Sequence, residues 1–143
     1  MAKSTNTCNS ILALIFNATT FTNIAQNGGS PLTDLYVSLH KGDPGVGGSQ
    51  LTNEADYGAY ARIPVVRTTS GWKLPESGST DNAALIQFVE CNGGSNSISH
   101  VAIGTDISGA GRVLYAGQLS SPRTISAGIQ PQFSAHALIV TET

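Results

Sequence analysis

Residues 34–45 read Asp-Leu-Tyr-Val-Ser-Leu-His-Lys-Gly-Asp-Pro-Gly, and this stretch decides the fold class. Leu35, Val37 and Leu39 alternate with other residues at the two-residue period of a half-buried β-strand. The Gly, Asp and Pro residues that follow end the strand, because these residue types favour turns over strand pairing. The segment therefore predicts a short strand closed by a turn, in a β-rich domain.

Similar units of strand and turn fill the rest of the chain. Predicted strands cover residues 60–67, 72–74, 83–89, 98–104, 113–119, 124–127 and 132–140, with segments rich in Gly, Pro or Ser between them. Pro64 places the first of these at an edge or a bulge. About eight short strands with such turns predict an all-β fold, a jelly-roll β-sandwich over residues 32–141. Its predicted core residues are Leu35, Val37, Leu39, Ile86, Phe88, Val101, Ile103, Leu114 and Ile139.

The N-terminal part differs from the rest. Residues 1–9 are polar and predict a flexible arm, whereas residues 10–18 have apolar positions at helical spacing and predict a short helix capped by Ser10 or Thr7. The run Asn-Gly-Gly-Ser-Pro at residues 27–31 then ends any helix. With 143 residues and no internal repeat or linker, we expect residues 1–143 to form a single domain.

The chain carries unusually little charge. Only 11% of its residues are Asp, Glu, Lys or Arg, against about 25% in typical domains. Such a surface suits a subunit of a permanent assembly, and it also suits a Gly/Ser/Thr-rich β domain of the extracellular type. The seven basic residues are scattered and the formal net charge is −2, so we expect no direct binding of nucleic acid.

The two cysteines, Cys8 and Cys91, are too few for a disulfide framework and lack metal-ligand spacing, so we expect free buried thiols. The apolar stretch at residues 11–16 is too short for a signal peptide or a membrane span. The sequence thus predicts a protein made in the cytoplasm, with no export signal and no membrane partner.

No pattern of residues predicts chemistry. His40, His100 and His136 lie far apart without the spacing of zinc ligands, and there is no G-x-S-x-G motif. The glycines at residues 45–48 lack the Lys-Ser/Thr of a phosphate-binding loop. We therefore expect no catalytic residues, no cofactor and no metal site.

One loop allows an alternative. Asp43, Glu54 and Asp56 fall within residues 41–57 and could form a weak calcium site, although the ligand spacing of an EF-hand is missing. Solvated charges, or salt bridges to Arg62 or Arg67, explain them more simply.

The order of these segments carries a resemblance to a known family. It rests on the following runs of sequence, in chain order: LYVSLH at 35–40, GDPG at 42–45, NEA at 53–55, YAR at 60–62, GW at 71–72, SHVAIGT at 99–105, LYAG at 114–117, FSA at 133–135 and LIVT at 138–141. The series resembles a family of small tailed-phage proteins, often labelled tail-fibre-like, whose better-understood relatives look like jelly-roll capsid cement proteins. The resemblance spans residues 8–142.

The resemblance implies a structural virion protein on the capsid exterior. Such a cement (decoration) protein clamps neighbouring copies of the major capsid protein, associates with itself as a dimer or trimer, and performs no catalysis. The N-terminal arm and the loop at residues 41–57 are the expected contact segments. The first alternative is a structural component of the tail or tail fibre. The second is a carbohydrate-binding β-sandwich in which Tyr57, Tyr60 and Trp72 stack on sugar rings.

Overall fold

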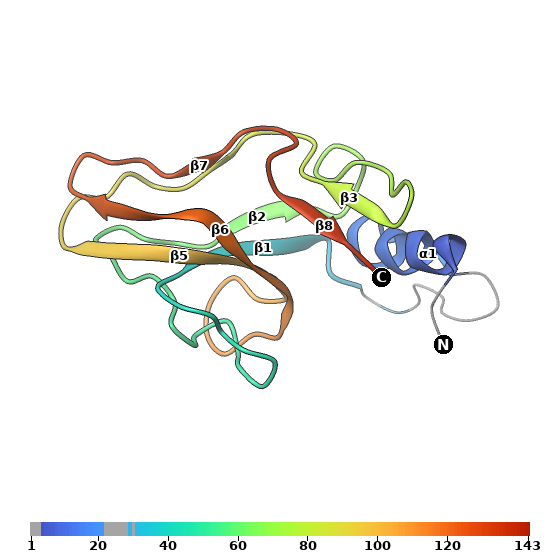
Figure 1. Cartoon of the computed structure of the whole chain (residues 1–143), viewed down its shortest axis with the longest axis horizontal. Coiled ribbons are helices and arrows are strands. Elements are labelled where there is room, and N and C mark those ends of the chain that lie inside the picture. The colour runs from blue at the N-terminus through green and yellow to red at the C-terminus, as the bar shows by residue number, and fades with distance from the viewer. Residues whose placement is uncertain (1–3, 22–28, 30) are drawn as a thin grey trace. The chain divides into compact units, whose positions relative to one another are not determined.

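The computed structural model describes residues 4–21, 29 and 31–143. In this part of the chain one helix precedes eight strands (Figure 1). They are α1 (Thr5–Phe16), β1 (Asp34–His40), β2 (Ile63–Val66), β3 (Ser79–Asp81), β4 (Ile86–Gln87), β5 (Ser95–Gly104), β6 (Val113–Ser126), β7 (Gln132–Phe133) and β8 (Ile139–Thr141). The predicted fold class is confirmed: antiparallel sheets, consistent with an all-β sandwich, follow one short N-terminal helix.

The strands form one sheet of four, in the order β2-β1-β5-β6, and two pairs, β3-β8 and β4-β7. In the centre of the larger sheet β1 runs antiparallel to β5, with Val37 opposite Ile103 and Leu39 opposite Val101. Directly opposed residues share a face of the sheet, and all four of these side chains are buried. The alternation seen in residues 34–40 therefore sets both the register of the central pair and the side that faces the core.

The chain forms two compact units, which we name by their main elements. The sheet unit contains Leu35–Pro64 and Gln87–Gln132, and the helix unit contains Met1–Asp34, Val65–Ile86 and Phe133–Thr143. The fully buried ring of Trp72 in the helix unit packs edge-on against Phe16 of α1, with ring centroids 4.6 Å apart.

Arg67 ties the end of α1 to the rest of the helix unit. Its Nε and Nη2 atoms donate to the carbonyl oxygens of Ile15 and Leu14, each at 2.6 Å. The last carbonyls of a helix lack partners within the helix, and the helix dipole favours a cation there. Burial of this guanidinium lowers the pKa of Arg67.

The helix begins earlier than predicted. Ser4 is its N-cap and accepts a hydrogen bond from the backbone N–H of Thr7 at 3.2 Å, so residues 5–9 are helical and Cys8 is buried. The prediction of a flexible arm at residues 1–9 is therefore wrong for residues 5–9, and residues 1–3 lie outside the described residues. The helix ends at Phe16, two residues before its predicted end, because Ala18 adopts a positive φ of 51°.

The segments predicted as separate strands at residues 113–119 and 124–127 form one strand, β6. Pro122, which we expected to separate them, lies inside it. Ile98 of β5 pairs with Arg123 of β6, and His100 of β5 pairs with Gln118. The two residues advanced along β5 thus correspond to five along β6, so β6 forms a bulge that contains the proline. Proline is tolerated there because β6 lies at an edge of the sheet.

Other strands are shorter than predicted. Within residues 83–89 only Ile86–Gln87 forms a strand, and Leu85 and Val89 are exposed rather than covered on both faces. Residues 132–140 contain two short strands, β7 and β8, in place of one. At residues 72–74, Trp72 forms only an isolated bridge with Asn82.

The prediction is wrong for two of the nine core residues. Ile139 is 64% exposed, while its neighbours Leu138 and Val140 are buried, so the facing of this segment is reversed. Leu114 is half-buried, next to an irregularity in the pairing of β5 with β6. The other seven residues are buried as predicted.

We expect Phe88→Ala to lower the free energy of unfolding by about 3–5 kcal/mol, because this side chain is 1% exposed and its loss leaves a cavity. The matched control is Ile139→Ala, which should cost about 0.5 kcal/mol or less because the side chain faces water. Chemical denaturation of both variants measures the two values. Equal losses would contradict this description of the core.

Candidate functional site

Two loops of the sheet unit lie side by side, at residues 41–57 after β1 and at residues 105–112 between β5 and β6 (Figure 1, teal and orange). The backbone N–H of Gln50 donates to the carbonyl of Gly111 at 2.8 Å, and Ser49 forms an isolated β-bridge with Arg112. We call these two segments the loop pair. Residues distant in sequence thus form one continuous surface.

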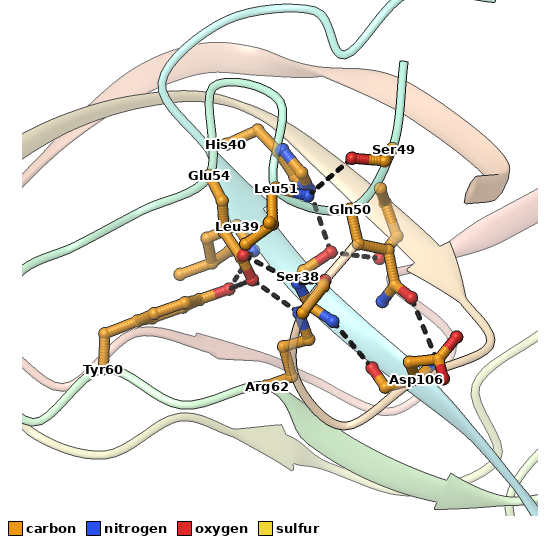
Figure 2. Close-up of polar contacts among 12 residues, drawn as sticks. Ser38, Leu39, His40, Ser49, Gln50, Leu51, Glu54, Tyr60, Arg62 and Asp106 are labelled. Carbon is orange, nitrogen blue, oxygen red and sulfur yellow. Dashed lines mark hydrogen bonds and ion pairs between the residues drawn. The ribbon is translucent and has the colours of Figure 1, made fainter. Parts of the chain in front are cut away.

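The side chain of Arg62 connects the two segments of the loop pair through hydrogen bonds. Its Nε and Nη2 atoms donate to the two carboxylate oxygens of Glu54 at 2.6 and 2.8 Å. Its Nη1 atom donates to the carbonyl of Asp106 at 2.9 Å (Figure 2). The Nη2 atom also donates to the carbonyl of Gly109 at 2.7 Å. The side chains of Arg62 and Glu54 are only 3% and 11% exposed. One guanidinium therefore binds both loops, and its hydrogen bonds to Glu54 raise the pKa of Arg62.

Tyr60 extends this network to β1. Its hydroxyl donates to Glu54 at 3.0 Å and accepts from the backbone N–H of Leu39 at 3.1 Å. Burial, with the nearby carboxylate adding to it, raises the pKa of Tyr60 far above its usual range. The phenol therefore stays protonated and fixes the position of Glu54.

Gln50 is the second link within the loop pair. Its fully buried side chain accepts from the backbone N–H of Asp106 at 3.0 Å. A Cβ atom on Gly104 or Gly111 would lie within 2.2 Å of this side chain. A side chain at either position would therefore displace the amide group of Gln50 from its present place.

His40 fixes the loop at residues 41–57 to β1. Its Nδ1 atom donates to the carbonyl of Thr52 at 2.9 Å, and its Nε2 atom lies within hydrogen-bonding distance of the Ser38 hydroxyl, at 2.9 Å. A serine beside a histidine has the spacing of a nucleophile and its base. Both side chains are fully buried, however, and the third partner is a backbone carbonyl. The pair is structural, and burial lowers the pKa of His40.

The three acidic residues of the suggested calcium site do not converge. Glu54 pairs with Arg62, and Asp56 forms an exposed salt bridge with Lys41 at 3.0 Å. Asp43 accepts a hydrogen bond from the N–H of Gly45 within its own turn. The salt-bridge explanation is confirmed for Glu54.

The remaining candidate side chains are also separate. His100 lies opposite His40 on β5, and His136 pairs with Asp81 in the helix unit. Among residues 4–21, 29 and 31–143, no three His, Cys, Asp or Glu side chains are grouped so that they could hold a metal ion. Both cysteines are buried and free, as predicted.

The aromatic residues of the carbohydrate-binding hypothesis are not available to a sugar. Trp72 is fully buried against Phe16, and Tyr57 is buried with its hydroxyl donating to the carbonyl of Val89. Tyr60 lies in the network under the loop pair. Stacking on sugar rings needs exposed aromatic faces, so this hypothesis is wrong for these three residues.

Three large apolar side chains of the loop pair are exposed. Val46 is fully exposed, and Leu51 and Ile107 are 55% and 61% exposed. Residues 44–52 and 107–111, which carry these side chains, contain no charged residue. We call Val46, Leu51 and Ile107 the apolar tip. A surface of this kind is inexpensive to desolvate, which suits contact with another protein.

A family model described as podophage GP4 fiber I protein gp80 matches residues 2–141. The chain belongs to this family. It is accordingly a structural protein of the bacteriophage virion, of a fibre-like family, and this membership favours a non-enzymatic role. No curated protein matches the chain. Among the described residues there is no helix of sufficient length and hydropathy to cross a membrane.

Breaking the buried ion pair should destabilise the fold far more than breaking an exposed one. Arg62→Met leaves the Glu54 carboxylate and two loop carbonyls without their partner, so we expect a loss of about 3–5 kcal/mol in the free energy of unfolding. Lys41→Met removes the exposed pair with Asp56 and should leave the denaturation midpoint nearly unchanged. Urea titrations of the two variants give the comparison. Similar midpoints would contradict a central role for Arg62.

His40 should make stability depend on pH. An imidazole in the unfolded chain titrates near pH 6.5, whereas the folded state resists protonation of His40. As pH falls from 7.5 to 5.5 the unfolded state therefore binds more protons, and the free energy of unfolding should decrease. His40→Gln should flatten this part of the profile, as measured by thermal denaturation across the range. An unchanged slope in the variant would assign the dependence to other groups.

Proposed function

We propose that this protein is a fibre subunit of a short-tailed phage particle and that it attaches to a neighbouring virion protein through its apolar tip. The family description supports the fibre location, because it names a fibre protein of a podophage. The tip supports the mode of attachment. Its three exposed apolar side chains lie on two loops that the buried side chain of Arg62 joins.

Rigidity is the physical argument for this surface. The loop pair is rich in glycine, and an unconstrained loop of this composition would lose much conformational entropy on binding. Arg62, Gln50 and His40 fix both loops before any partner arrives. The tip is therefore preorganised, so more of the energy of apolar contact remains as affinity.

The second candidate is a cement protein that clamps the major capsid protein on the capsid exterior. Two points favour it: the order of the sequence runs resembles a family whose better-understood relatives look like jelly-roll cement proteins, and the described residues contain no long repetitive element of a fibre shaft. Many copies with one modest interface each would gain strength through avidity. Neither role involves a catalytic step.

Experiments on particles that lack this protein distinguish the fibre location from the capsid location. Loss of a fibre subunit should reduce adsorption to cells and leave the temperature of DNA release unchanged. Loss of a cement subunit should lower the temperature of DNA release and leave adsorption unchanged. We expect the first result, and the second would overturn the fibre location in favour of the capsid.

Substitutions that add charge to the apolar tip test whether the tip contacts a neighbouring virion protein. Leu51→Asp with Ile107→Asp should abolish incorporation into particles when the variant is supplied in place of the native protein, because an unpaired carboxylate is costly to bury at an apolar contact. Incorporation is measured by immunoblotting of purified particles.

The matched control is Leu74→Asp, which adds a carboxylate at a similarly exposed apolar residue of the helix unit. It should incorporate normally. Unfolding curves of all variants exclude loss of the fold. Normal incorporation of the folded double variant would show that attachment uses another surface.

A further inference from the structure

Strand β6 lies at an edge of the four-stranded sheet, with β5 on its inner side. Within the described part of the chain, no strand pairs with its outer side. An edge strand offers a row of backbone N–H and C=O groups that can pair with another strand, and natural proteins usually block such edges with charge, proline or bulges. The distribution of these features along β6 shows which part of the edge is open.

Most of the blocking features lie toward the C-terminal end of β6, although a shorter irregularity lies at Leu114. The large bulge covers residues 118–123 and includes Pro122 and Arg123. Residues 113–118 read Val-Leu-Tyr-Ala-Gly-Gln, with no charge and no proline, and Ala116, Gly117 and Gln118 are exposed. After the irregularity next to Leu114, residues 115–118 pair with β5 in unbroken register. An open, straight segment therefore remains around Ala116.

We propose that a second copy of this chain pairs with this segment, antiparallel and centred on Ala116, to form a symmetric dimer. In this register each Tyr115 lies opposite Gly117 of the second copy, on either side of the central alanines. An aromatic residue opposite a glycine is a stabilising cross-strand pair, because the ring covers the exposed backbone. The small residues at the centre let the two strands approach closely.

Charge and symmetry favour a second copy over another strand. Arg112 is already bridged to Ser49 of the loop pair, and Arg123 lies beyond the paired segment, so no like charges meet across the two-fold axis. A two-fold interface also consumes both open edges at once, so pairing stops at the dimer and does not grow into a filament. The opposite edge of the sheet is β2, which contains Pro64 and is blocked.

The first test is the mass of the purified full chain. Sedimentation equilibrium over a range of concentrations should show a monomer–dimer equilibrium. Ala116→Lys places two like charges directly opposite each other and should raise the dissociation constant of the dimer at least tenfold. Thr124→Lys adds the same charge to the same strand at an exposed residue beyond the paired segment, and should leave the dissociation constant nearly unchanged.

The second test locates the two-fold axis. Directly opposed residues of antiparallel strands have Cα atoms about 4.5–5.5 Å apart, within the range of a disulfide. Ala116→Cys should therefore form a covalent dimer under mild oxidation. In Gln118→Cys the two thiols would lie four positions apart along the strands, about 13 Å, and should not cross-link. The native thiols of Cys8 and Cys91 are buried and should not contribute.

Three results would overturn the proposal. They are a monomer at every concentration, equal cross-linking of the two cysteine variants, and cross-linking of Ala116→Cys in particles only to a different virion protein. Because the first test uses the isolated chain, its outcome does not depend on whether the protein sits on the fibre or on the capsid. Far-ultraviolet circular dichroism of each variant confirms that the sheet is intact.

Discussion

The guanidinium of Arg62 lies between two loops with almost all of its surface removed from water, and the position of both loops depends on it. A buried charge is tolerated only when each of its hydrogen-bonding groups has a partner. Here Glu54 supplies two acceptors, and the carbonyls of Asp106 and Gly109 supply the others. Any displacement of either loop would leave part of this charge unpaired. These hydrogen bonds thereby restrain a glycine-rich surface.

Sequence patterns predicted the centre of the fold well because two adjacent strands share one apolar face that packs in the core. The opposite face is also buried at Ser38, His40 and Ala102, which the pattern did not predict. In residues 35–39 and 101–103 the period of two marks that face directly, and the side chains lie as predicted. The pattern failed where it carried no such information. Leu138, Ile139 and Val140 are consecutive apolar residues, so periodicity cannot say which of them faces the core. Pro122 indicated a break between two strands. Its actual place, in a bulge of an edge strand, depends on residues that are distant in sequence and could not be predicted.

Less of the candidate site than of the fold could be predicted from the sequence. The Glu54–Arg62 salt bridge was one of the expected alternatives, since both residues flank the same loop. The carbonyls of Asp106 and Gly109 could not be predicted, because a backbone acceptor leaves no trace in residue type. The link between Ser38 and His40 had a signal that we did not use: residues two apart on a strand share a face.

The two surfaces of the sheet unit have separate roles in this account: the apolar tip attaches the chain to the particle, and β6 joins two copies. The most direct test of the central claim is cryo-electron microscopy of the intact virion. The account predicts density for this chain in which residues 44–52 and 107–111 contact another virion protein. A reconstruction in which the chain is bound to the particle while both of these segments face solvent would contradict it.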